Sequence, residues 1–326
     1  NKVQVNGFVV RDDCDEPSHP MSEGTIHDYL LKNGIPGISG VDTRAITRKL
    51  RSAGVMMGII TPNENVEAAL KSLAKAPRYG EFDVVGAVST DEIYAWNGDA
   101  GERSRAYFDL RGRALQGGMG IAVERGIGHH DLGDNLMKVV VNDYGVKLNI
   151  LRSLRARGCE VIVVPDDASA DDILGLNPDG VMLSPGPGDP ELLDRSVDTA
   201  KGLAGKVPIM GICLGHQVIA RAFGASTFKL HFGHRGGNQP VKDLESGRVY
   251  VTAQNHGYAV DAEALPDELQ VSHINLNDQT VEGLRHRDLP IMTIQYHSEA
   301  SPGPHDSEYL FDRFVELIRT GVTATV

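Results

Sequence analysis

A cysteine flanked by two glycines is the residue best placed to do chemistry in this chain. It lies at the centre of the segment Gly211-Ile-Cys-Leu-Gly-His-Gln217. The apolar run at residues 207–212 predicts a buried strand, and residues 218–223 have the apolar spacing of a helix. Cys213 is therefore expected on a sharp turn, where flanking glycines avoid crowding and the first N–H groups of the helix favour a thiolate. This pattern predicts a nucleophile; the alternative is an ordinary cysteine packed at a strand end.

A histidine and a glutamate two residues apart could supply the proton transfer that a cysteine nucleophile needs. His297 and Glu299 come directly after a second apolar run, residues 290–295. In an extended chain their side chains point the same way, so the carboxylate can fix the tautomer of the imidazole. Alone the pair is a weak pattern, because the chain has 12 histidines and 44 acidic residues. Its place at the end of a predicted strand favours a base and its orienting partner, since open α/β sheets gather active sites there.

A loop rich in proline and glycine, Ser184-Pro-Gly-Pro-Gly-Asp-Pro190, follows a third apolar run at residues 180–183. The prolines stiffen such a loop, and the glycines leave its N–H groups open to a ligand. It could form half of an oxyanion hole, with the N–H of Leu214 as the other half. Taken alone, the segment would be interpreted as a surface turn.

Strands and helices alternate from residue 136 onward. We predict strands at 137–141 and 160–164, a helix at 145–157 that ends at Gly158, and a short helix capped by Ser169. Such alternation is typical of a parallel sheet covered on both faces. The predicted fold class is therefore α/β, with a C-terminal doubly wound, mostly parallel sheet in a domain of residues 136–326.

A smaller N-terminal α/β domain is predicted over residues 1–95, and a glycine-rich linker over residues 96–135. A strand is expected within residues 3–10, and helices at 22–33 and 42–54. The second helix carries three basic side chains, which form either a solvated face or a contact for a partner protein: Arg44, Arg48 and Arg51.

The composition of the chain argues against nucleic-acid binding, membrane association and a disulfide-bonded fold. The 326-residue chain has a net charge of -12, which argues against nucleic acid or an anionic membrane as a partner. Its three cysteines predict no disulfide framework and suit a reducing, cytoplasmic location. No apolar run approaches the roughly 18 residues of a membrane span. We discount two pairs of histidines as metal ligands, so no metal is predicted: His129 with His130, in the segment Gly128-His-His-Asp131, and His231 with His234, in an expected turn.

Together, the three segments resemble the class I glutamine amidotransferase family, whose active site is a Cys-His-Glu triad. Other segments narrow the resemblance to the small, glutaminase subunits of carbamoyl-phosphate synthetases and extend it over nearly the whole chain except residues 97–134. They are Gly40-Val-Asp-Thr-Arg-Ala-Ile-Thr-Arg48, Phe232-Gly-His-Arg-Gly-Gly-Asn238, Gln254-Asn-His-Gly-Tyr-Ala-Val260 and Glu299-Ala-Ser-Pro-Gly-Pro-His-Asp306.

The resemblance implies Cys213 as nucleophile, His297 as general base and acid, and Glu299 as its orienting partner. It also implies a glutamine-binding site with oxyanion-binding N–H groups, made by Gly186, Gly188, Leu214, Gln217, Asn255, Gly257 and Tyr258. Tyr258 could instead be a core aromatic residue. Two features depart from the family pattern: Ser298 stands where many relatives have proline, and a serine that contacts the substrate in relatives would precede residue 1.

The implied function is hydrolysis of L-glutamine, with ammonia passed to the large synthetase subunit for carbamoyl phosphate formation from bicarbonate and ATP. No P-loop occurs in this chain, so no cofactor is expected here, and ATP and Mg²⁺ are expected in the partner. Two alternatives stay open. The chain could be a catalytically weak or silent scaffold for the large subunit, or the glutaminase of another amidotransferase. The sequence does not distinguish whether its product serves arginine synthesis, pyrimidine synthesis or a specialised pathway.

Overall fold

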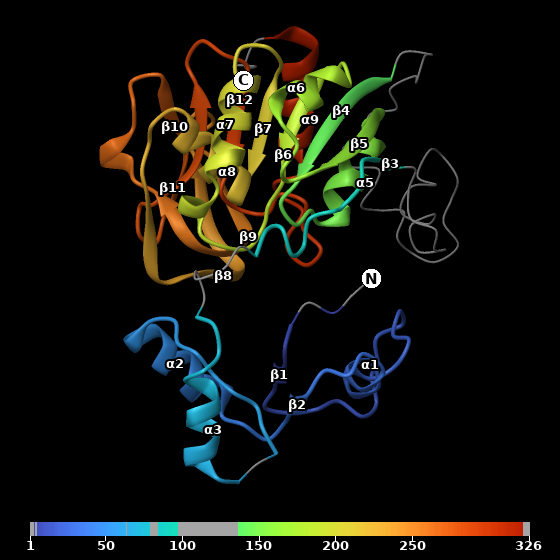
Figure 1. Ribbon diagram of the computed structural model, residues 1–326, viewed down its shortest axis with the longest axis vertical. Coiled ribbons are helices and arrows are strands. Elements are labelled where there is room, and N and C mark those ends of the chain that lie inside the picture. Colours follow the sequence, from blue (N-terminus) through green and yellow to red (C-terminus); the bar gives the residue numbers. More distant parts are fainter. Residues whose placement is uncertain (1–2, 4, 63, 79–83, 97–135, 322–326) are drawn as a thin grey trace. The chain divides into compact units, whose positions relative to one another are not determined.

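The computed structural model describes residues 3, 5–62, 64–78, 84–96 and 136–321 of the chain. These residues form two compact units, Asn1–Phe82 and Asp83–Val326, which are described separately (Figure 1). Most of the predicted linker, with His129 and His130, lies outside the described residues. No helix in the described ranges is long and apolar enough to cross a bilayer.

The N-terminal unit contains short elements with few buried side chains. Its described strands, β1 (Phe8–Val9) and β2 (Gly37–Ile38), pair in parallel, and its helices are α1 (Ile26–Lys32), α2 (Thr43–Ala53) and α3 (Val66–Leu73). The predicted α2 is confirmed at both ends: Asp42 accepts from the N–H of Ala45, and Gly54 has a φ of 84°. Helix α1 begins later than expected, because Thr25 rather than Ser22 caps it.

The N-terminal unit ends earlier than the predicted residue 95. Strand β3 (Tyr94–Trp96) pairs antiparallel with β5 (Cys159–Pro165), at the edge of the large sheet. Val85 is 1% exposed within an apolar cluster of the same unit. Residues 84–96 therefore belong to the larger unit, because their strand pairing and burial lie there.

Five parallel strands form the centre of the large sheet, in the order β5, β4, β6, β7 and β12. The remaining bounds are β4 (Met137–Asp143), β6 (Gly180–Leu183), β7 (Ile209–Ile212) and β12 (Ile291–Ile294). Most of these strands are buried along their length, as their continuous apolar runs predict for a sheet covered on both faces. The predicted α/β fold class is confirmed.

An antiparallel extension, which the apolar pattern did not reveal, continues the sheet beyond β12. Its strands follow in the order β11 (Val281–His286), β10 (Leu269–Asn275), β8 (Thr227–Asp243) and β9 (Val249–Val260). The turn expected around His234 is wrong, because this segment lies within β8. Glycines 233 and 236 have φ angles of 71° and 107°, and the pairing with β9 is irregular on both sides of them.

Helices cover both faces of the parallel strands (Figure 1). One apolar cluster joins the sheet to α5 (Leu148–Ala156) and α9 (Tyr309–Thr320). A second joins it to α6 (Ala170–Gly175), α7 (Asp194–Leu203) and α8 (Leu214–Ala222). Short 3₁₀ turns lie at Pro190–Leu192 and Ala262–Ala264. This double cover leaves the carboxyl ends of the strands as the place where loops can gather side chains.

Candidate active site

Cys213 lies at the junction between β7 and α8, on the sharp turn that its flanking glycines predict. Its φ of 53° and ψ of -102° are unusual for a residue with a side chain, and the residue is 4% exposed. The main-chain N–H of Cys213 donates to the carbonyl of Ile294, the last residue of β12, at 2.8 Å. The turn is thereby tied to the strand that leads into His297.

The two glycines beside Cys213 are required by close main-chain approaches. A Cβ atom on Gly211 would lie 2.6 Å from the carbonyl oxygen of Gly215. One on Gly215 would overlap the carbonyl of Leu183, at the end of β6, and one on Gly186 would overlap the carbonyl of Tyr144. The turn, α8 and the loop at 184–190 thus pack with no room for side chains at these positions.

His297 and Glu299 form a short contact just beyond β12. His297 Nδ1 donates to Glu299 Oε1 at 2.7 Å, and Glu299 is completely buried. Lys147 lies 3.0 Å from the same carboxylate oxygen, and Asn149 donates to the main-chain carbonyl of Glu299. The buried carboxylate therefore has two partners, His297 and Lys147, while Asn149 holds the main chain of Glu299.

The same contacts shift the pKa values of both residues. Burial works against the charged form of His297, but the Glu299 carboxylate and a hydrogen bond with Cys213 outweigh it and raise the pKa of His297 to about 10. Burial would raise the pKa of Glu299, yet His297 and Lys147 hold it below its usual value. The His297 ring thus interacts with the Glu299 carboxylate and with Cys213, and both interactions favour its protonated form.

Tyr258 connects the segments predicted to bind glutamine. Its hydroxyl donates to Asp189 of the proline-glycine loop at 2.7 Å. Its main-chain carbonyl accepts from Gln217, one turn after Cys213, at 2.9 Å. The side chain is 7% exposed, and its polar contacts distinguish it from a purely apolar core residue.

The other residues predicted at the site lie on the same three segments. Gly186 and Gly188 lie in the loop after β6, Leu214 is the first residue of α8, and Asn255 and Gly257 are on β9. Asn255 is exposed and alternates with the buried positions 254 and 256, so its side chain lies on the opposite face of β9 from theirs. The structure thus brings the loop, the turn and β9 together around the three predicted catalytic residues.

Three residues that sequence reasoning missed contact this site: Lys147, Asn149 and Gln295. Lys147 directly precedes α5 and Asn149 lies in its first turn. Both contact Glu299, which is about 150 residues further along the chain. Gln295 is fully buried, and its side-chain oxygen accepts from Gln217 at 2.9 Å. Gln295 directly follows β12, so a polar residue at the end of an apolar run was the available signal.

One cluster of metal-ligating types occurs among the described residues: His234, His256 and Glu282. Their potential ligand atoms lie within 4.8 Å of one another, and all three residues are buried. Several of these atoms already contact protein partners, among them His256 Nδ1 with Tyr258 O at 2.8 Å. The cluster lies on β8, β9 and β11 and includes none of Cys213, His297 and Glu299.

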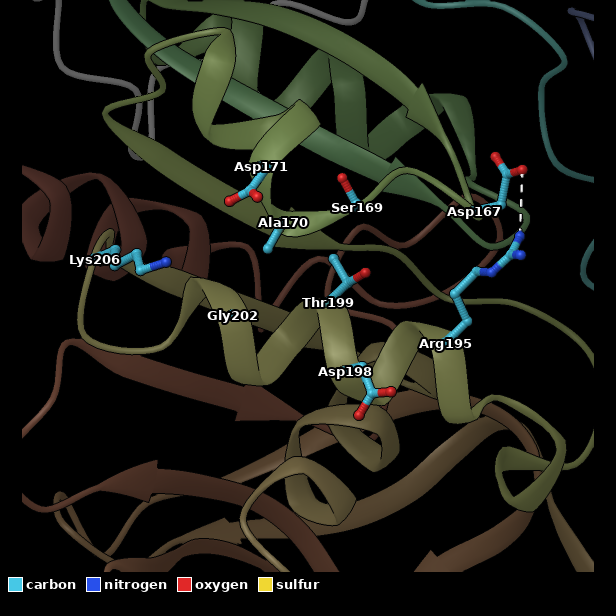
Figure 2. Close-up of a pocket in the computed structure, with 9 residues that line it drawn as sticks. All are labelled: Asp167, Ser169, Ala170, Asp171, Arg195, Asp198, Thr199, Gly202 and Lys206. Carbon is cyan, nitrogen blue, oxygen red and sulfur yellow. Dashed lines mark ion pairs between the residues drawn. The ribbon is translucent and has the colours of Figure 1, made fainter.

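A shallow surface pocket between α6 and α7 is separate from these residues (Figure 2). Charged side chains of both signs line it, and Arg195 and Asp167 form an ion pair of 3.5 Å across one end. None of the predicted catalytic or glutamine-binding residues is among the residues that line it.

The class of protein that this fold and these motifs define is the class I glutamine amidotransferases. The family model of that description matches residues 139–317, and the model for the CPSase domain of the carbamoyl-phosphate synthase small chain matches residues 1–60. A solved structure from Thermoplasma acidophilum, described as a GMP synthase subunit, has a TM-score of 0.51 and 26% identity, over 58% of this chain and 96% of that one.

Curated relatives narrow the class further. The carbamoyl phosphate synthase small chain of Rhodopirellula baltica is 46% identical over 325 residues, which are 99% of this chain and 80% of the relative. That of Staphylococcus epidermidis is 45% identical over 320 residues, covering 97% and 76% of the two chains. The chain belongs to the carbamoyl phosphate synthase small chain family. This membership confirms the resemblance drawn from the motifs and, with it, the enzyme class.

Proposed function

We propose that this chain hydrolyses L-glutamine with Cys213, His297 and Glu299, and delivers the ammonia to the large subunit of a carbamoyl-phosphate synthetase. The observation that supports the proposal is the interaction of the His297 ring with both Cys213 and the buried Glu299 carboxylate, together with the positive φ of Cys213 on its strand-to-helix turn. Family membership supports the substrate and the partner.

The reaction begins when Cys213, as the thiolate whose proton His297 holds, attacks the side-chain amide carbon of glutamine through Sγ. The carbonyl oxygen becomes an oxyanion, for which the N–H groups of Leu214 and Gly186 are the proposed donors. His297 gives its proton to the departing nitrogen, so ammonia leaves and a γ-glutamyl thioester remains. His297 then takes a proton from water, whose oxygen attacks the thioester; the C–S bond breaks, glutamate is released, and the Cys213 sulfur again pairs with the proton on His297.

The supporting residues have separate proposed roles. Glu299 orients His297 and stabilises its positive charge, while Lys147 offsets the charge of that buried carboxylate. Gln217, Asn255, Gly257 and Tyr258, together with Gly188, are proposed to contact the polar groups of glutamine. A substrate with an ammonium, a carboxylate and an amide needs such polar partners.

The proposed partner supplies the ATP-dependent steps, for which this chain has no recognisable motif. Condensing ammonia with bicarbonate requires phosphoryl transfer, and we place ATP and Mg²⁺ in the large subunit, with no cofactor in this chain. Free ammonia would be protonated in neutral water and lost as a nucleophile. The proposal therefore includes direct transfer of ammonia between the two subunits.

A glutaminase assay with and without the large subunit tests this proposal. The parent chain should release glutamate from glutamine, and Cys213→Ser should abolish both this release and glutamine-dependent synthesis, because a γ-glutamyl thioester needs sulfur. Free ammonia should still support synthesis by the assembled complex that carries Cys213→Ser.

Two outcomes would favour the alternatives. A parent chain that binds the large subunit but releases no glutamate would be a silent scaffold. A parent chain that releases glutamate but supports no carbamoyl phosphate formation with the large subunit would be the glutaminase of another amidotransferase.

A further inference from the structure

A connected row of polar side chains, contributed by β8, β9, β10, β11 and the turn between β10 and β11, runs from the surface to the main chain of Tyr258. We call it the β9 network; its members are Asp278, His234, Glu282, Asn275, Gln254 and His256. Asp278 is the partly exposed end, with a side chain 40% exposed, and the other members are nine-tenths or more buried. None of them belongs to the proposed triad or to the residues proposed to contact glutamine.

His234 is clamped between two carboxylates in this network. Its Nε2 donates to Asp278 Oδ2 at 2.7 Å, and its Nδ1 lies 3.4 Å from Glu282 Oε1. Burial favours the neutral ring, but Glu282 and Asp278 outweigh it, so the pKa of His234 is raised. The ring can therefore carry the positive charge that a fully buried carboxylate requires.

Glu282 connects His234 to side chains on β9 and β10. Its Oε1 accepts from Gln254 Nε2 and from Asn275 Nδ2, both at 2.9 Å. Gln254 Oε1 lies 2.9 Å from His256 Nε2, and His256 Nδ1 lies 2.8 Å from Tyr258 O. These contacts join His234 to the carbonyl that also accepts from Gln217. Burial lowers the pKa of His256 to about 3, so its neutral ring donates to one of the two oxygens that it contacts.

We propose that His234 is a positioning residue for the glutamine pocket, where, held between Asp278 and Glu282, it fixes the β9 network and through it the main chain at Tyr258. This inference rests on the proposed glutaminase function. Gln217 and Tyr258 are proposed substrate contacts. Among the described residues, no hydrogen bond or ion pair joins the network to Cys213, His297 or Glu299, although the charge of His297 acts on His256. Loosening the network should therefore weaken glutamine binding more than it slows the chemical steps.

His234→Asn, assayed in the full chain assembled with the large subunit, tests the proposal. The KM for glutamine should rise by about tenfold or more while kcat stays within about threefold of the parent value. Ammonia-dependent synthesis should be unchanged. His231→Asn is the matched control, because His231 is exposed on the same strand three residues away, and its KM should equal that of the parent.

Asp278→Asn provides a second variant if His234→Asn folds poorly. The amide oxygen can still accept from His234, but the negative charge is lost, and the partly exposed side chain makes the change mild for folding. We expect a smaller rise in KM, again with kcat retained.

Three results would overturn the inference. An unchanged KM in both variants would show that the network does not act on the pocket. A fall in kcat and in the amount of folded protein, with KM unchanged, would show a merely structural role. Stoichiometric metal in the purified parent, lost in His234→Asn, would show that the three ligand-type residues form a metal centre instead.

The two proposals fail in different ways. If the parent complex shows no glutaminase activity, the proposed function fails and this inference falls with it. If the parent is active and Cys213→Ser is not, but His234→Asn behaves like His231→Asn, the inference alone fails.

Discussion

His297 and Glu299 are in contact at 2.7 Å, but replacing them should reduce the rate of glutamine hydrolysis to different extents. His297→Asn removes the proposed proton carrier, and general acid–base catalysis contributes roughly 10²- to 10⁴-fold to a rate. Glu299→Gln keeps a hydrogen-bonding partner for the ring and should cost less. Steady-state glutamine hydrolysis by the two variants measures the difference. Equal and negligible losses would remove the pair from the mechanism.

The raised pKa of His297 predicts how stability depends on pH. The pKa of His297 is about 10 in the folded chain, whereas the usual pKa of a histidine is 6.5. The folded chain therefore holds this proton more tightly than the unfolded chain does. The unfolded chain therefore releases this proton first as pH rises, so the contribution of His297 to the free energy of unfolding is complete below about pH 6.5 and is lost toward pH 10.

Denaturant unfolding of the parent and of Glu299→Gln, followed from pH 6 to 10 (about the range of this titration), measures this contribution. The Glu299 carboxylate contributes most to raising the pKa of His297. The variant without this charge should therefore lose less stability over this pH interval than the parent does. Parallel curves for the two proteins would contradict the assignment.

At the scale of the elements, the junction of β6, β7 and α8 depends on glycine. Gly215→Ala would force a Cβ atom onto the carbonyl of Leu183, and overpacking of this kind costs about 1–3 kcal/mol or more. Gly175→Ala, at the end of α6, is the matched control, since a Cβ atom there meets no atom within 4 Å. Chemical unfolding should show a lower midpoint for the first variant only. Similar midpoints would mean that the turn can shift to admit a side chain.

At the scale of the whole molecule, the N-terminal unit is the proposed docking element for the large subunit. Helix α2 has no buried residue, and Arg44 and Arg48 lie four positions apart on its exposed surface. Changing both to Glu should weaken co-purification with the large subunit, with little effect on folding, and should make the complex more sensitive to salt.

Lys71 and Lys75, also exposed and four positions apart in the same unit, offer a matched charge reversal. Changing these two to Glu should leave the complex intact if docking is specific to α2. Equal affinity for the parent and the Arg44/Arg48 double variant would assign α2 to the solvated surface.

The sequence by itself determined the features that depend on neighbouring residues. Apolar runs located the five parallel strands, Asp42 and Gly54 marked the ends of α2, and the glycines around Cys213 predicted its turn. These features follow from local sterics, side-chain period and capping, each of which acts over a few residues. The motifs also carried enough information to place the chain in its family.

Only the tertiary structure decided which distant residues share the site. Lys147 meets Glu299, Asp189 meets Tyr258, and His234 lies between Asp278 and Glu282, all across long separations in the chain. The antiparallel strands β8 to β11, which bring His234 and Tyr258 to the site, were likewise unseen in the apolar pattern. Strand pairing depends on which distant segments meet, and buried charge contacts depend on which groups lose water when they do. The spacing of apolar residues along the chain contains neither kind of information.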